Sequence, residues 1–399
     1  MGVKIKAIDL FSGCGGVSCG LAKIKFAVKV AVEIDNIAAD IYHNYPPLSK
    51  VNILRKDICD ITGEELLKTA NIHPGELYLL AGCPPCQNFT MQNPNNKKKP
   101  EEERKKLLFE FLRVIEEMHP PFILMENVPG IVADFNKNIL NQFIDRLENK
   151  NGKSNNEKYY VVTNVINAAD YGVPQLRKRF VLHAVRIDIH RELQAYGKIF
   201  TLPFPTHDKH EENGLLPWIT VREAIGDLPS ISAGEVYEGN QNIYNHKCAN
   251  LSEKNLQRIR YIRAHGGSRD ALPDDMILEC HKKKNDEGNV FSGHKDVYGI
   301  MDPDKPSPTM TGGCLCYTKG RYGHYAQDRA ISIREAARFQ TFPDDFKFSN
   351  SLGNSALQIG NAVPVKLVEA SAGEFKKAIL TLIHERRKKQ TQQSSSDIP

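Results

Sequence analysis

Two short motifs contain the side chains best suited to covalent chemistry. The first is Pro84-Pro85-Cys86-Gln87-Asn88, which follows the apolar run at residues 77–82. The run predicts a buried strand, and the two prolines end it because they lack backbone donors. We therefore expect Cys86 in a stiff loop at the end of a sheet, where open α/β folds place their chemistry.

The second motif repeats this arrangement about forty residues later. The apolar residues 122–125 lead into Glu126-Asn127-Val128. If the two predicted strands are neighbours, the Cys86 thiol and the Glu126 carboxylate can reach one small molecule from two sides. Glu126 alone would be a solvated strand end, so the hypothesis depends on the pair.

A glycine-rich turn at residues 11–16 lies between a predicted strand and a predicted helix. Glycines let a backbone approach a ligand, but Ser18 stands where the dinucleotide signature needs a further glycine. Glu33 and Asp57 end the next two strands, where carboxylates bind ribose and can accept from an adenine amino group. A ligand with adenosine and no pyrophosphate fits best, such as S-adenosylmethionine. A plain turn with two solvated acids is the alternative.

Alternating strands and helices position these residues. This alternation predicts the α/β class, with a mostly parallel, doubly wound sheet. The predicted strands are residues 5–11, 27–34, 51–58, 77–82, 122–125, 159–166 and 179–185, and the predicted helices are 17–25, 37–42, 64–70, 104–118 and a segment ending near 148.

The composition changes after residue 190. Pro, Gly, His and Tyr become frequent, which predicts a second, smaller and loop-rich domain. Lysines and tyrosines interleave over residues 298–325, a pattern typical of nucleic-acid contact and also of ordinary surface loops. Helices are predicted at residues 255–263, 333–339 and 357–384, and residues 386–399 are expected to be a disordered basic and polar tail.

The bulk composition is that of a globular protein. The chain has 399 residues, 41% hydrophobic and 25% charged, and a net charge of +5 permits a polyanionic partner without requiring one. Nine scattered cysteines and no signal-peptide pattern predict a cytoplasmic protein with reduced thiols. No apolar run is long enough to span a membrane, so no membrane partner is expected.

The cysteine pairs allow two other hypotheses. Cys83 and Cys86 have the spacing of thiol–disulfide exchangers, but a thioredoxin-like pattern is missing nearby. Cys314-Leu315-Cys316 lacks the spacing of a zinc site, so no metal is predicted.

Eight segments, in order, resemble the motifs of the cytosine carbon-5 DNA methyltransferases. They are residues 9–16, 32–35, 56–58, 82–87, 125–128, 175–179, 333–340 and 358–364. The resemblance covers most of the chain and implies a Rossmann-like, S-adenosylmethionine-dependent domain at residues 1–190, completed by residues 352–385. A target-recognition domain would span residues 191–351.

The resemblance also implies roles for individual residues. Cys86 would be the nucleophile, Glu126 would bind the cytosine edge, and Arg177 and Arg179 would assist. The residues expected to contact S-adenosylmethionine are Phe11, Ser12, Gly13, Gly15, Glu33, Ile34, Asp57, Ile58, Pro85, Leu108, Asn361 and Ala362. The lysine-rich residues 88–106 are expected to close over a flipped base and contact phosphates.

The expected substrate is cytosine in double-stranded DNA. A monomer is expected, in a bacterial or phage-infected cell, with a cognate restriction endonuclease acting separately. A tRNA cytosine methyltransferase is the first alternative, because one branch of the family acts on RNA. A catalytically inactive DNA-binding relative is the second, although Cys86, Glu126, Arg177 and Asn361 are all present.

Overall fold

The computed structural model describes residues 5–73, 75–76, 78–85, 89, 99–148, 158–210, 214–239, 242–279, 282 and 296–396. The chain divides into two compact units, which are described one at a time. The first unit comprises residues 1–167, 178–205 and 365–399, and the second comprises residues 168–177 and 206–364.

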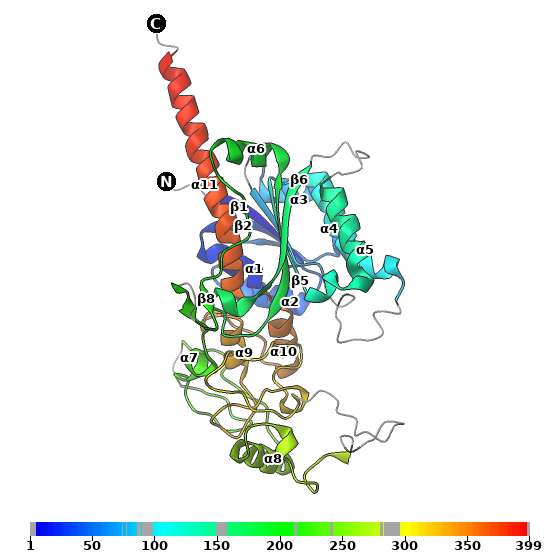
Figure 1. The fold of residues 1–399 in the computed structure, drawn as a ribbon, viewed down its shortest axis with the longest axis vertical. Helices are drawn as coiled ribbons and strands as arrows, with labels where there is room; N and C mark the ends of the chain where they lie inside the picture. Colours follow the sequence, from blue (N-terminus) through cyan, green and yellow to red (C-terminus); the bar gives the residue numbers. More distant parts are fainter. Residues whose placement is uncertain are drawn as a thin grey trace. The chain divides into compact units, whose positions relative to one another are not determined.

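A seven-stranded sheet in the order β3-β2-β1-β4-β5-β7-β6 forms the centre of the first unit (Figure 1). Strands β1 to β5 are parallel, whereas β7 is antiparallel to both β5 and β6. This arrangement confirms the predicted α/β class. The strands are β1 Ile5–Leu10, β2 Phe26–Val32, β3 Asn52–Leu54, β4 Tyr78–Gly82, β5 Phe122–Asn127, β6 Tyr159–Asn167 and β7 Lys178–Arg186.

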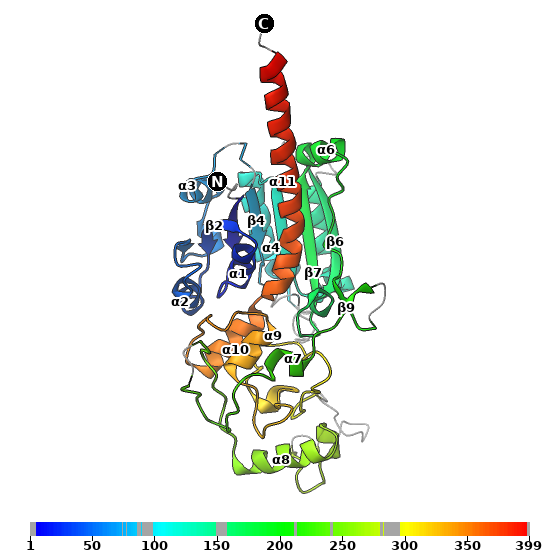
Figure 2. The same cartoon turned by 90° about the vertical axis from the view of Figure 1, so that its left-hand side faces the viewer.

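Helices cover both faces of this sheet (Figures 1 and 2). Alternate strand residues such as Leu10 and Met125 share a buried core with α3, α4 and α5, as the two-residue period of a strand requires. On the other face, the Phe375 ring of α11 lies 6.0 Å from the ring of Phe122. The helices of this unit are α1 Gly16–Lys23, α2 Asn36–Asn44, α3 Gly63–Ala70, α4 Glu101–Met118, α5 Asp134–Leu147, α6 Ile187–Ala195 and α11 Val365–Ser396.

The predicted last helix, residues 357–384, is two helices. Helix α10 (Leu352–Asn361) ends where Ala362 adopts an extended conformation, and α11 begins at Val365. Pro364 explains the break, because proline lacks a backbone donor and disfavours helical geometry in the preceding residue.

The expected disordered tail also differs from the structure, in which α11 continues to Ser396. The Arg386 guanidinium lies 2.7 Å from the carboxylate of Glu192 in α6. This ion pair, and the absence of Gly or Pro from residues 386–396, favour continuation of the helix.

Short elements and long loops make up the second unit. They include β8 His207–Asp208, β9 Leu216–Pro217, α7 Val221–Ile225, α8 Glu253–Ala264, α9 Ile333–Phe339 and α10. A buried ion pair orders its centre: Arg329 lies 2.6 Å from Glu335, and both side chains are fully buried. Glu335 also accepts from the backbone of Ser332, which caps α9. Burial acts to raise the pKa of Glu335, but Arg329, His324 and the N–H of Ser332 together outweigh it and lower the pKa.

The boundaries of the units differ from the predicted domains at three places. Residues 168–177 and 352–364 group with the second unit, whereas residues 191–205, predicted in the target-recognition domain, group with the first. Of the predicted C-terminal part of the catalytic domain, residues from 365 onward group with the sheet.

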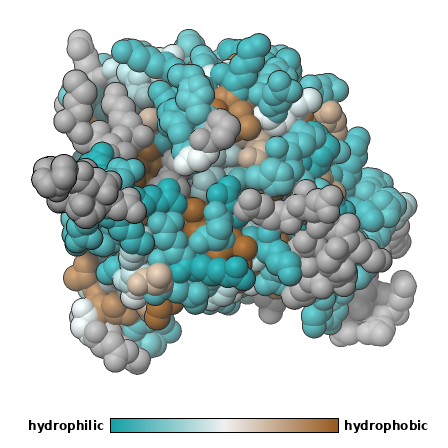
Figure 3. All heavy atoms as spheres, turned by 90° about the horizontal axis from the view of Figure 1, so that it is seen from above, coloured by the Kyte–Doolittle hydropathy of each residue, from teal (hydrophilic) through white to brown (hydrophobic). Residues whose placement is uncertain are grey.

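The surface is mainly hydrophilic on the face shown in Figure 3, with small separate hydrophobic areas. Scattered exposed apolar residues are normal for globular proteins. None of the helices in the described ranges combines the length and apolar character that a membrane span requires.

Candidate active site

The parallel strands end side by side at one edge of the sheet. Leu10 pairs with Val32 and with Gly82, and Gly82 pairs with Met125. Glu33 follows β2 directly and Glu126 is the second-last residue of β5, so both lie at the same edge. The sheet thus brings the predicted cofactor and catalytic motifs of the first unit together.

The glycine-rich turn after β1 is open at Gly13 and crowded at Gly15. Gly13 has φ +54°, and a Cβ there would meet nothing within 4 Å. Gly15 has φ +99°, and a Cβ there would lie 2.9 Å from the Tyr42 ring. The first glycine therefore leaves space for a ligand, whereas the second lets α1 begin close to α2.

Glu33 is fixed by the backbone around it. Its two carboxylate oxygens accept from the N–H groups of Gly13 (2.7 Å) and Asp35 (2.8 Å). Burial raises the pKa of Glu33, and these two bonds partly offset the increase. The adjacent Ile34 is 63% exposed and presents an apolar surface next to the carboxylate.

Asp57 lies after β3 and caps the short 3-10 helix Ile58–Asp60. Its carboxylate accepts from the N–H of Cys59 at 3.0 Å, which lowers its pKa. Asp57 is therefore a partly exposed, charged acceptor. Together with Glu33, Ile34 and the open Gly13 it suits an adenosine group, so the first unit fits S-adenosylmethionine.

Three predicted cofactor residues lie beneath the surface. Ser12 donates to the carbonyl of Val32, Ile58 is buried, and Leu108 belongs to the core beside Phe11. These side chains support the edge of the sheet, whereas Pro85 is exposed. Asn361 and Ala362 belong to the second unit.

Glu126 forms an ion pair with Arg179, in which Oε1 and Nε are 2.8 Å apart. The antiparallel register explains this contact, because Asn127 of β5 pairs with Phe180 of β7 and the start of β7 meets the end of β5. Both side chains are largely buried. A carboxylate and a guanidinium thus lie at the predicted base-binding position.

Arg177 has different surroundings, although it is only two residues away in sequence. It belongs to the second unit and is 2% exposed. Its guanidinium donates to the carbonyl groups of Met310 (2.8 Å), Gly360 (2.9 Å) and Ala362 (3.0 Å). These bonds give Arg177 a structural role in the second unit, and of the two arginines Arg179 is the one beside Glu126.

Cys86 lies outside the described residues, but the approach to it is described. The buried side chain of Asn127 donates from Nδ2 to the carbonyl of Pro84 at 3.1 Å. Its Oδ1 accepts from the N–H of Val128 at 2.8 Å. Asn127 therefore joins the residues after β4 to the end of β5. This role was not predicted from the sequence, where Glu126 was the functional candidate in this motif.

The predicted DNA-contacting loop is shorter than expected. Residues 90–98 lie outside the described part of the chain, but α4 already begins at Glu101. Arg104 is therefore helical and buried, and Lys99 forms an ion pair with Glu103 at 2.6 Å. Because the guanidinium of Arg104 is buried and bonded to Phe135 and Asn136, the prediction that it contacts phosphate is wrong.

A buried polar chain lies under the glycine-rich turn. Tyr42 donates to Ser18 at 2.7 Å, and Ser18 donates to Oδ2 of Asp9 at 2.6 Å. Burial raises the pKa of Asp9 to about 7. The sequence signal was Asp9 inside an apolar strand, a polar residue that must find partners once buried.

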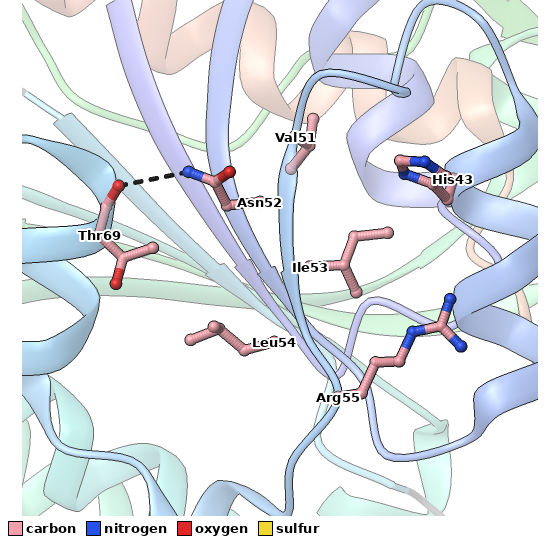
Figure 4. A pocket seen from close by; sticks show the side chains of 7 residues that line it. All are labelled: His43, Val51, Asn52, Ile53, Leu54, Arg55 and Thr69. Carbon is pink, nitrogen blue, oxygen red and sulfur yellow. Dashed lines mark hydrogen bonds between the residues drawn. The ribbon is translucent and has the colours of Figure 1, made fainter.

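A pocket of about 620 Å³ lies along the edge strand β3, away from these residues (Figure 4). His43, Asn52, Arg55 and Thr69 line it with the apolar residues of β3, and Asn52 donates to the carbonyl of Thr69. No predicted site residue lines this pocket. Within the described ranges no cluster of three His, Cys, Asp or Glu side chains suits a metal ion.

Residues 5–377 match the family model described as C-5 cytosine-specific DNA methylase. The chain is 37% identical over 387 residues to the type II methylase M.HgiDII of Herpetosiphon aurantiacus, covering 96% of this chain and 97% of that protein. It is 32% identical over 371 residues to the type II methyltransferase M1.HphI of Haemophilus parahaemolyticus, covering 93% and 86%.

Solved structures show the same fold. A protein described as a DNA modification methyltransferase, encoded within an E. coli prophage, aligns with a TM-score of 0.63 at 23% identity, covering 94% of this chain and 99% of that one. The S. pombe Dnmt2 methyltransferase aligns with a TM-score of 0.56 at 16% identity, covering 96% and 99%. With the family match and the arrangement of strand ends, these findings show that the chain belongs to the C-5 cytosine-specific DNA methylases.

Proposed function

We propose that this enzyme methylates carbon 5 of cytosine in a defined sequence of double-stranded DNA through a transient bond between Cys86 and carbon 6 of the base. The observation that carries the proposal is the Glu126–Arg179 pair, 2.8 Å apart at the end of β5. The neighbouring strand β4 leads directly towards Cys86.

Cysteine suits this reaction because it is a soft nucleophile that also leaves readily. A thiol of ordinary pKa, about 8.5, is only a few per cent ionised at pH 7. Full ionisation would gain about 2 kcal/mol, since one pKa unit is worth about 1.4 kcal/mol. Enzymatic barrier reductions are about 8 kcal/mol or more, so activation of the ring must supply most of the remainder.

Glu126 and Arg179 are placed to activate the ring. Glu126 is paired with Arg179 before the base binds. In the proposed reaction its protonated form would donate to ring nitrogen 3 as Cys86 adds, while Arg179 would orient the carboxyl group and donate to the ring oxygen. Carbon 5 then becomes nucleophilic. S-adenosylmethionine, when bound, would supply the methyl group from its sulfonium and would leave as S-adenosylhomocysteine. Loss of the carbon-5 proton to a base or water finally releases Cys86.

Glu33, Ile34 and Asp57 would bind the adenosine part of this cofactor at the ends of β2 and β3. Glu33 has two backbone N–H groups that orient it, which leaves its remaining lone pairs for ribose hydroxyls. Asp57 retains its negative charge and can accept from the adenine amino group.

A base within a stacked duplex cannot reach Cys86, so the cytosine must rotate out of the helix at a cost of a few kcal/mol. The second unit would recognise the surrounding sequence. M.HgiDII and M1.HphI are named as type II enzymes, which supports a role in a type II modification system. We propose that the protein acts there as a cytoplasmic monomer, with a separate cognate endonuclease.

The test uses duplex DNA containing 5-fluorocytosine. Fluorine at carbon 5 blocks the final elimination, so wild-type protein should form an adduct that survives denaturation, and Cys86→Ser should form none. Bisulfite sequencing of DNA from expressing cells should identify the modified sequence. Full methyl transfer by Cys86→Ser, or labelling of tRNA and not of duplex DNA, would refute the proposal.

A further inference from the structure

A second buried polar chain, formed by Arg104 and Asn136, connects three segments of the first unit. Arg104, in the first turn of α4, donates through Nη1 to the carbonyl of Phe135 at 2.7 Å and to Oδ1 of Asn136. Asn136, in α5, donates through Nδ2 to the carbonyl of Gly130 at 2.8 Å. Gly130 lies in the 3-10 helix Pro129–Val132, directly after the Glu126 motif.

Burying these polar groups costs more desolvation free energy than packing alone would require. Arg104 is 9% exposed, and among the described residues no carboxylate forms an ion pair with it. Its Nε is buried without a hydrogen-bond partner in the described structure, and its charge is offset by two acceptors and by the Phe135 ring, 5.6 Å away. An apolar residue would fill such a position at lower desolvation cost.

Asn136 fits its two partners specifically. It is fully buried, its Oδ1 accepts from Arg104 and its Nδ2 donates to Gly130. An isosteric Asp can accept from Arg104 but cannot donate to Gly130. The geometry therefore requires an amide at this position.

The segments joined in this way flank the reacting groups. Helix α4 begins at Glu101, after Pro85 and Cys86 in the sequence. Gly130 lies four positions after Glu126. The Asn127–Pro84 bond separately joins the end of β5 to the residues that follow β4. We propose that Arg104 and Asn136 are positioning residues that fix the Glu126 segment relative to the start of α4, an inference that rests on the proposed roles of Cys86 and Glu126.

The key variant is Asn136→Asp, which removes the donor to Gly130 and retains the acceptor for Arg104. Asn141→Asp makes the same change at an exposed position of α5. Arg104→Lys is a second, milder variant that keeps the charge and loses the planar guanidinium. It replaces Asn136→Asp if that protein does not fold.

Three quantities are measured on full-length protein: the single-turnover methyl-transfer rate at saturating DNA and cofactor, the rate of adduct formation with 5-fluorocytosine DNA, and the DNA dissociation constant. Small displacements near reacting groups can cost up to about a hundredfold in rate. We expect both rates to fall tenfold or more in Asn136→Asp, with the dissociation constant within twofold. Asn141→Asp should behave as wild type.

The outcomes distinguish failure of the positioning role from failure of the proposed function. Unchanged rates in Asn136→Asp, or weaker DNA binding with an unchanged rate, would overturn the positioning role. A rate loss that merely equals the unfolded fraction would do the same. If wild-type protein forms no adduct, the proposed function itself fails. If wild type forms an adduct, Cys86→Ser does not, and Asn136→Asp matches wild type, only this inference fails.

Discussion

Arg179 Nε lies 2.8 Å from Glu126 Oε1, and both side chains retain little exposure to solvent. The contact exists because β7 runs antiparallel to β5 and begins where β5 ends. In the proposed reaction the guanidinium would therefore be in place before the base arrives, and preorganised charge of this kind is a major source of catalysis.

Replacing Arg179 should impair the chemical step. We expect Arg179→Met to lower kcat by about a hundredfold or more, the size of effect seen when a preorganised donor is removed. Steady-state assays with duplex DNA measure this change. Arg186→Met, at the other end of β7 where Arg186 pairs with Asp188, is the matched control. Equal kcat values for the two variants would contradict the assignment.

Replacing Arg177 should instead destabilise the second unit. Arg177→Met leaves the carbonyl groups of Met310 and Gly360 without their donor, whereas the carbonyl of Ala362 still accepts from Gln340. The expected loss is about 3 kcal/mol of unfolding free energy, since unsatisfied buried groups cost about 1–3 kcal/mol each. Trp218 is the single tryptophan of the chain and lies in this unit, so its fluorescence during urea unfolding reports the change. A midpoint shift in Arg179→Met as large as that in Arg177→Met would argue against this distinction.

The Glu335 carboxylate should be equally important for that unit. Glu335→Gln removes one partner of the buried pair with Arg329, a change that costs about 3–5 kcal/mol. Because the folded pKa of Glu335 is lowered, its contribution is present above the ordinary pKa of a glutamate and declines as pH falls towards the folded pKa. Trp218 fluorescence in urea again provides the measurement. The control is Glu253→Gln, which changes an exposed residue. It should change the free energy of unfolding by less than about 1 kcal/mol. An equal effect of the two variants would disprove the prediction.

Asp9 should make stability fall as pH rises. Its folded pKa is raised to about 7 by burial, so between pH 4 and 7 the folded state binds a proton that the unfolded state has lost. The wild type thus loses about 1.4 kcal/mol per pH unit from this group across that window. Asp9→Asn, which can still accept from Ser18, lacks this dependence.

The measurement for Asp9 is urea unfolding of both proteins between pH 5 and 8. The stability of Asp9→Asn relative to wild type should increase with pH and level off above about pH 7. A difference that stays constant over this range would show that Asp9 does not titrate there.

Much of the first unit could be predicted from the sequence, because buried parallel strands appear as apolar runs that end in Gly, Pro or acidic residues. The runs before Glu33, Cys83 and Glu126 indicated both the strands and the edge that carries the site. The break between α10 and α11 was not predicted: Pro364 carried the signal for it, but the apolar pattern on both sides led to a prediction of one helix.

Other features depend on distant contacts that no local pattern encodes. Arg177 and Arg179 are alternate residues of one short motif, and only the three-dimensional structure shows that one donates to carbonyl groups and the other pairs with Glu126. The burial of Arg104 depends on Asn136. In the sequence alone, Arg104 is indistinguishable from the solvated lysines beside it.

The position of Phe375 against Phe122 and His183 has a consequence for biosynthesis. A ribosome completes β5 long before it reaches α11. The face of the nascent sheet that α11 covers therefore stays uncovered while the second unit is synthesised. During this interval an apolar face is available to chaperones or to aggregation. A premature stop codon anywhere before residue 375 should therefore yield an insoluble fragment, however complete its catalytic motifs are.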